Sequence, residues 1–142
     1  RPLVRPFDLR AVILGTGGAA RAVGYALNLL GISVQFVSRT KRMGVITYEE
    51  LADMKLLATT SLVINCTPFG MHPHTTTFPP LPYREISSYH LLYDLIYNPE
   101  ETLFLSRGKE QGAMTKNGLE MLHLQAEKSW DIWQESFDTS SF

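Results

Sequence analysis

The feature that most constrains the fold is a glycine-rich turn between a strand pattern and a helix pattern, ILGTGGAARAV at residues 13–23. The apolar, branched run RAVIL (10–14) predicts a buried strand, and residues 19–30 predict a helix that ends at Gly31. Glycines at such a junction allow a tight turn and leave backbone amides free at the start of the helix. This order of strand, glycine turn and helix is typical of folds that bind phosphate groups at their first strand-to-helix connection. A tight turn without a ligand is the alternative.

Apolar runs of strand length recur along the chain and alternate with helix patterns. Further strands are expected at SVQFV (33–37), SLVIN (61–65), HLLYDLI (90–96) and, as a short strand, AMT (113–115). This alternation predicts a Rossmann-type doubly wound parallel sheet, α/β in class, in a single domain. Only about ten residues join 33–37 to Thr47, fewer than a parallel crossover needs, so no helix is expected between them. GVITY (44–48) is then either a short edge strand or a covering loop.

Capping signals mark the expected boundaries of three helices after the first. The second helix is expected over about 48–57, after a capping box formed by Thr47 and Glu50, and the third begins at Asn98-Pro99, with Pro99 at its first helical position, and ends near Gly112. The last helix is expected from Asn117, which has Glu120 three residues further on, to about Gln134. Residues 10–135 therefore form the expected domain. Residues 1–9 are interpreted as a linker from a missing N-terminal domain, and 136–142 as a C-terminal tail.

Composition and charge exclude several classes of function. The 13 basic and 14 acidic residues nearly cancel, so no nucleic-acid partner is expected. No apolar run approaches the roughly 20 residues of a membrane helix, so no membrane partner is expected either. The single cysteine, Cys66, cannot form an internal disulfide, which favours a cytoplasmic protein. His72 and His74 lie in a Pro- and Thr-containing loop with no third ligand nearby, so no metal site is expected.

The glycine turn predicts a pyrophosphate site, and the end of the second strand predicts which nucleotide binds there. Gly15 permits the tight turn, while Gly17 and Gly18 let a pyrophosphate approach the backbone. An NAD site places Asp or Glu at the end of the second strand, but SRTKR (38–42) contains no acid. Arg39 can bind a 2′-phosphate with its forked guanidinium and stack on adenine. A solvated basic turn is the alternative, and the pattern favours NADP.

Polar residues at the ends of the later strands extend this crevice. Asn65 and Thr67 lie at the end of 61–65, where the strands of an open sheet line the ligand site. Cys66 is interpreted as a packing residue, since nothing near it in sequence activates the thiol. Asp94 is interpreted as a structural acceptor for loop amides rather than a base. Tyr97 either places its hydroxyl in the crevice or belongs to the core.

Four stretches in this order resemble the C-terminal half of the shikimate dehydrogenase family: GTGGAAR, SRT, NCTPFGM, and DLIYNP with the downstream NGLEMLHLQA. They fall within residues 10–134. The resemblance implies an oxidoreductase of the shikimate pathway, in aromatic amino acid biosynthesis, that reduces 3-dehydroshikimate to shikimate with NADPH. The implied cofactor contacts are Gly15, Thr16, Gly17, Gly18 and Ala19 for the pyrophosphate, Ser38, Arg39, Thr40 and Lys41 around the 2′-phosphate, Leu95 and Gly118 about the nicotinamide, and in addition Thr67 and Met121. The implied substrate contacts are Tyr97 and Gln125.

In this family a substrate domain precedes the nucleotide domain and carries a catalytic Lys–Asp pair. Nine residues precede the first expected strand, so no catalytic residue is expected in this chain, and the chain alone is expected to be inactive. Three alternatives stay open: a stand-alone NADP-binding module without turnover, an NAD-preferring quinate/shikimate dehydrogenase domain, which Arg39 argues against, and a scaffold that binds no nucleotide. The last helix carries a second apolar stripe with Met121 and Ile132, which predicts a weak homodimer.

Overall fold

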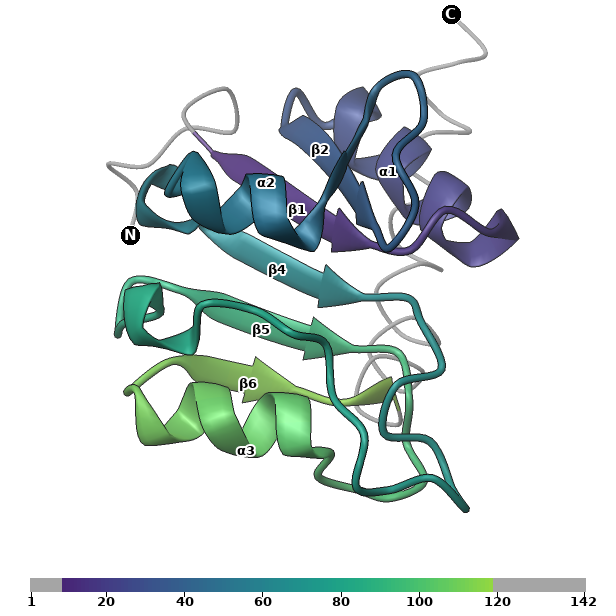
Figure 1. Cartoon of the computed structure of the whole chain (residues 1–142), viewed down its shortest axis with the longest axis vertical. Helices are drawn as coiled ribbons and strands as arrows, with labels where there is room; N and C mark the ends of the chain where they lie inside the picture. The colour runs from purple at the N-terminus through teal and green to yellow at the C-terminus, as the bar shows by residue number, and fades with distance from the viewer. Residues whose placement is uncertain (1–8, 119–142) are drawn as a thin grey trace, which may run out of the picture.

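The computed structural model describes residues 9–118, which form a six-stranded sheet in which all paired strands are parallel (Figure 1). The spatial order is β3-β2-β1-β4-β5-β6. The chain therefore runs outward in both directions from the central pair β1 and β4, as in a dinucleotide-binding sheet, and the expected doubly wound fold is confirmed. The strands are β1 (Arg10–Leu14), β2 (Ser33–Ser38), β3 (Val45–Thr47), β4 (Leu62–Asn65), β5 (Leu91–Asp94) and β6 (Met114–Lys116).

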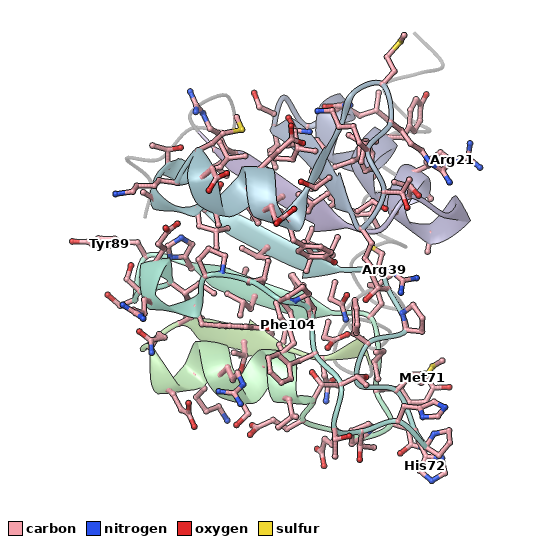
Figure 2. All side chains as sticks on the ribbon, in the orientation of Figure 1. Arg21, Arg39, Met71, His72, Tyr89 and Phe104 are labelled. Carbon is pink, nitrogen blue, oxygen red and sulfur yellow. The ribbon has the colours of Figure 1, made fainter. Side chains whose placement is uncertain are left out.

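Two helices cover one face of the sheet and bury the main core. Val12 and Leu14 of β1 pack there in a cluster that also contains Leu51 and Phe104. Figure 2 shows Phe104 between its helix and the strands. The helices are α1 (Gly18–Leu29), α2 (Tyr48–Asp53) and α3 (Leu103–Glu110), with two short 3-10 helices, η2 (Leu56–Thr59) and η3 (Tyr83–Glu85); α2 and α3 carry this face.

Helix α1 packs on the opposite face through a close approach of its backbone. Because side chains alternate along a strand, Ile13 points away from the core that contains Val12 and Leu14. A Cβ atom added at Gly24 of α1 would lie 2.6 Å from Cζ of Phe36 and 3.4 Å from Cδ1 of Ile13. Gly24 therefore lets α1 lie directly against β1 and β2. The helix ends as expected, with Gly31 at a φ of 83° just beyond it.

The segment left open by the sequence, GVITY, contains a short parallel edge strand. β3 pairs with β2 in the register Phe36–Val45 and Ser38–Thr47. Because β3 begins opposite Phe36, the loop 39–44 returns the chain by only about two residues, roughly 7 Å, and no crossover helix is needed. The expected capping box is confirmed: Thr47 Oγ1 accepts from Glu50 N at 3.1 Å, and Glu50 Oε1 accepts from Thr47 N at 2.9 Å.

Three expected elements have other bounds in the structure. The helix expected to reach residue 57 ends at Asp53, and η2 follows after Lys55, whose φ is 50°. The helix expected to open at Pro99 begins at Leu103 instead, because Thr102 is the N-cap that accepts from Leu105 N at 3.4 Å. The strand expected over 90–96 is Leu91–Asp94.

The expected last helix beyond Gly118, residues 1–8 of the expected linker 1–9, and the expected tail 136–142 fall outside the described residues. The same holds for Met121, Gln125 and Ile132, and thus for the second apolar stripe on which the homodimer prediction rests. Among residues 9–118, no helix is both long and apolar enough to cross a membrane.

Candidate functional site

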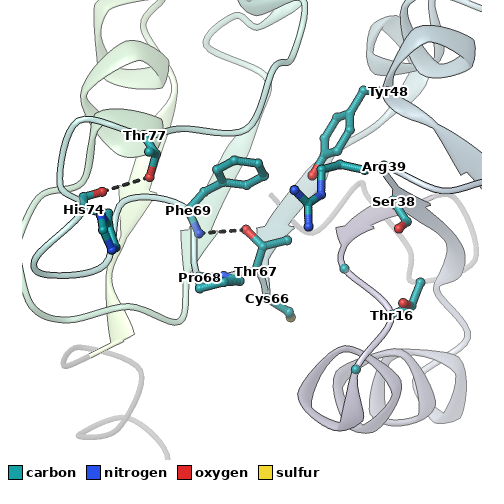
Figure 3. A pocket seen from close by; sticks show the side chains of 12 residues that line it. Thr16, Ser38, Arg39, Tyr48, Cys66, Thr67, Pro68, Phe69, His74 and Thr77 are labelled. Atoms are coloured by element: carbon teal, nitrogen blue, oxygen red, sulfur yellow. Dashed lines mark hydrogen bonds between the residues drawn. The ribbon is translucent and has the colours of Figure 1, made fainter.

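A crevice lies at the carboxyl ends of β1 and β4, the two strands from which the sheet diverges. It consists of two cavities that share Cys66, Thr67 and Pro68. The first, about 470 Å³, lies between the glycine turn, the end of β2 and the loop after β4 (Figure 3). The second, about 580 Å³, lies between Ala19 and the segment 95–98 after β5. In open α/β sheets, ligands bind at this position, and both volumes lie in the range of ligand pockets.

Gly15 makes the turn from β1 into the crevice possible. Its φ is 110°, a conformation that residues with a side chain rarely adopt. An added Cβ would also lie 3.3 Å from the carbonyl oxygen of Cys66 and from Cγ2 of Thr67. Backbone hydrogen bonds tie the turn to the sheet, since Gly15 N donates to Val37 O at 2.7 Å. Glycine is therefore needed at position 15 for conformation and for space.

The start of α1 presents free backbone amides to the crevice. Gly17 is the N-cap, with no side chain that caps the helix, and the first turn contains no acidic residue. A Cβ added at Gly17 or Gly18 would meet no atom within 4 Å, so the space above these residues is open. Thr16 and Gly17 line the first cavity, and Ala19 lines the second. Unpaired amides and the positive end of a helix dipole suit an anion at this point.

The end of β2 places one guanidinium on the first cavity. Ser38 and Arg39 line it, and Arg39 is exposed (Figures 2 and 3). Ser38 Oγ accepts from Thr40 N at 3.3 Å, which shapes the turn. Lys41 points elsewhere: its Nζ lies 3.1 Å from Glu50 Oε1 on α2. Among the residues that the structure describes, Arg39 is therefore the one Lys or Arg whose side chain lines the crevice.

A buried polar network holds the ends of β4 and β5 together. Asn65 Nδ2 donates to Asp94 Oδ1 at 3.1 Å, and Asn65 Oδ1 accepts from the hydroxyl of Thr67 at 2.5 Å and from its amide at 3.1 Å. Asn65 and Asp94 are both 0% exposed. Thr67, which lines both cavities, is thus oriented by a side chain that has no access to solvent.

Asp94 acts as the expected structural acceptor. Besides Asn65, it accepts from Ile96 N at 3.0 Å and from the Thr102 hydroxyl at 2.5 Å. These bonds end β5 and fix the N-terminus of α3. Burial raises the pKa of Asp94 to about 6, although its hydrogen bonds to Thr102, Ile96 and Asn65 lower it.

The second cavity brings the predicted residues after β5 to the crevice. Leu95 and Tyr97 line it, and Tyr97 is 55% exposed, so this tyrosine is not a core residue. Gly118 packs against the backbone behind them: its amide donates to Ile96 O at 3.0 Å, and an added Cβ would collide with Leu95 O. The structure thus brings Leu95 and Gly118 together.

Sequence reasoning missed several lining residues. Tyr48, His74 and Thr77 line the first cavity, and His72 lines the second. The loop after β4 folds back because Thr77 Oγ1 accepts from Gly70 N at 2.8 Å and donates to His74 O at 2.8 Å. The return of this loop to the crevice depends on these contacts, which no sequence pattern marks.

The thiol of Cys66 is not activated, as expected, although Cys66 is half-buried and lines both cavities. Burial, and secondarily the nearby Asp94, raises the pKa of the thiol to about 12, so it is protonated at neutral pH and a poor nucleophile. Within residues 9–118, no three His, Cys, Asp or Glu side chains are grouped so that they could hold a metal ion.

Comparison with curated proteins supports the resemblance to the shikimate dehydrogenase family, although no family model matches the chain. A curated relative, shikimate dehydrogenase (NADP(+)) of Carboxydothermus hydrogenoformans, is 39% identical over 137 residues, covering 87% of this chain and 49% of the relative. The chain spans about half the length of the curated relatives it matches.

Solved structures agree with this match. A shikimate dehydrogenase in complex with NADP+ superposes with a TM-score of 0.71 at 30% identity, over 92% of this chain and 50% of that one. The enzyme of Thermus thermophilus, in complex with NADP(H) and shikimate, gives a TM-score of 0.68 at 29% identity, over 91% and 50%. By sequence and by fold, the chain is therefore homologous to the Rossmann-type half of the shikimate dehydrogenases.

Proposed function

We propose that this chain is the NADP(H)-binding domain of a shikimate dehydrogenase, which reduces 3-dehydroshikimate to shikimate. The observation that carries the proposal is a crevice that joins the uncapped start of α1 to Arg39, with no acidic residue at the end of β2. The relatives support it, since the curated ones are named for NADP(+), and a solved one contains NADP(H) and shikimate.

The dinucleotide would extend along both cavities. The amides of residues 15–19 would bind the pyrophosphate, since the space above Gly17 and Gly18 is open. Arg39, with the hydroxyls of Ser38 and Thr40, would bind the 2′-phosphate at one end. Lys41, which was expected to share this contact, is paired with Glu50, so its charge is largely cancelled.

The nicotinamide would lie at the other end, in the second cavity. Thr67 and Leu95 line that cavity, Gly118 packs against the backbone of Leu95, and Met121 would add to this contact. Tyr97 and, in the helix expected from the sequence, Gln125 would face the substrate. The bound cofactor supplies a hydride, and the residues of this chain bind and orient the ring.

The proton donor and the groups that bind the substrate carboxylate would come from a substrate domain outside this chain. The domain proposed here is residues 10–135. The purified 142-residue chain should therefore bind NADPH but show no measurable turnover with shikimate and NADP+.

The proposal is tested by calorimetric titration with NADPH and NADH. NADPH should bind more tightly, and Arg39→Asp should weaken NADPH by about 10- to 100-fold, because a charge-assisted phosphate contact becomes a repulsion. Arg42→Asp makes the same charge change at an exposed residue that lines neither cavity, and it should change the affinity far less. Equal affinities for the two nucleotides would contradict the NADP assignment and favour the alternative of an NAD-preferring dehydrogenase domain. If neither nucleotide binds, the alternative of a scaffold that binds no nucleotide is favoured.

A further inference from the structure

Tyr48 is a residue of the crevice that no motif in the sequence marks. We propose that its hydroxyl donates a hydrogen bond to the 2′-phosphate of NADP(H) and so helps to select NADPH over NADH. This inference rests on the proposed function and names a residue that determines its cofactor specificity.

The register of the sheet places Tyr48 beside Arg39. Ser38 of β2 pairs with Thr47 of β3, and the two strands are parallel. The residues that follow, Arg39 and Tyr48, therefore leave the sheet side by side at the same edge. The Thr47–Glu50 capping box ends β3 and starts α2 at this point, which fixes the backbone of Tyr48. The short edge strand thus brings a tyrosine to the end of the crevice that carries the guanidinium.

The hydroxyl of Tyr48 is buried and has no partner. The residue is 7% exposed, yet it lines the first cavity. Its oxygen makes no hydrogen bond within the described structure. Figure 3 shows the hydroxyl end of the ring beside the Arg39 guanidinium, with the ring on the wall of the cavity. Buried polar groups are rarely left unpaired, and leaving one unpaired is costly, so an acceptor supplied by a ligand accounts for this arrangement.

The charge around the hydroxyl favours an anionic acceptor. Burial raises the pKa of Tyr48 to about 12, and the nearby Arg39 lowers it only in part, so the phenol is a donor at neutral pH. A phosphate oxygen can accept from the phenol and the guanidinium together. The 2′-hydroxyl of NADH is neutral, so a bond to it would be weaker.

The test is Tyr48→Phe, with NADPH and NADH titrated separately by calorimetry. NADPH should bind about 10-fold more weakly, as expected for loss of a hydrogen bond to a charged group, and NADH should change by less than about 2-fold. In the unliganded protein, Tm should stay the same or rise by a few degrees, because the variant removes an unpaired buried hydroxyl. Affinity for NADPH and thermal stability should therefore move independently or in opposite directions.

Tyr83→Phe is the matched control. Its hydroxyl donates to Pro79 O at 2.8 Å, and it lines neither cavity. This variant should lower Tm and leave the ratio of the two affinities unchanged. If Tyr48→Phe keeps the wild-type ratio, or lowers Tm as the control does, Tyr48 has only a structural role. If the wild-type protein itself shows no preference for NADPH, the NADP assignment fails first, and the role of Tyr48 fails with it.

Discussion

The buried carboxyl of Asp94 should make the stability of this protein depend on pH in an unusual direction. Its pKa rises from 3.8 to about 6 on folding, chiefly through burial. Between these values the folded state binds more protons than the unfolded state, so the free energy of unfolding falls as pH rises. The stabilisation by the protonated form is complete below about pH 4 and is lost above about pH 6. A shift of this size corresponds to about 3 kcal/mol.

Asp94→Asn separates this effect from other titrations. The asparagine Oδ1 can still accept from Asn65 and Ile96, but its amide would face the Thr102 hydroxyl, which then lacks its acceptor. The lost bond costs about 1–3 kcal/mol at any pH. The variant should therefore be less stable than wild type by that amount at pH 4. At pH 7, where the wild type has lost its own stabilisation of about 3 kcal/mol, the variant should be as stable as the wild type or up to about 2 kcal/mol more stable.

Urea denaturation of both proteins from pH 4 to pH 8 measures the difference directly. Asp53→Asn, at an exposed position on α2, is the control and should leave the shape of the profile unchanged. A difference between Asp94→Asn and wild type that stays constant from pH 4 to pH 7 would refute the reasoning, since it would mean that Asp94 does not change its charge in this range.

Three further predictions concern the glycine turn and the cap. Gly15→Ala should lower the free energy of unfolding by about 1–3 kcal/mol in urea denaturation. The backbone at position 15 has a positive φ, and the added Cβ would lie close to Cys66 and Thr67. Gly17→Ala, with open space around it, should cost less than about 1 kcal/mol and weaken NADPH binding instead. Thr47→Ala should cost about 1 kcal/mol through loss of the capping box, and an unchanged midpoint would contradict that role.

Features set by neighbours in sequence could be predicted, and those set by distant partners could not. The glycine turn, the capping box at Thr47 and the apolar strands are local patterns, and the structure confirms them. Pro99 carries a valid local signal for a helix start, but Thr102 caps α3 instead, because its hydroxyl bonds both to the helix and to Asp94 eight residues away. The helix start is thus decided by a contact with the end of a strand.

The candidate site divides in the same way. Gly15 and Arg39 follow directly from strand ends and could be placed on the crevice from sequence alone. Tyr48 could not, because its position depends on the pairing of β3 with β2. A segment that could equally be a loop gives no register, and without the register nothing places the tyrosine beside Arg39.

The short connection between β2 and β3 links this fold to the charge of its crevice. A crossover helix would move the start of the next element away from the end of β2, whereas the loop 39–44 keeps the start of α2 beside Arg39. The Lys41–Glu50 ion pair fastens the loop to α2, and its opposite charges largely cancel. An exposed pair of this kind adds little stability, so its main effect is on position and local charge. What faces the cavity is then one guanidinium beside hydroxyl groups, which suits an anion with several acceptor oxygens better than the uncharged ribose of NADH.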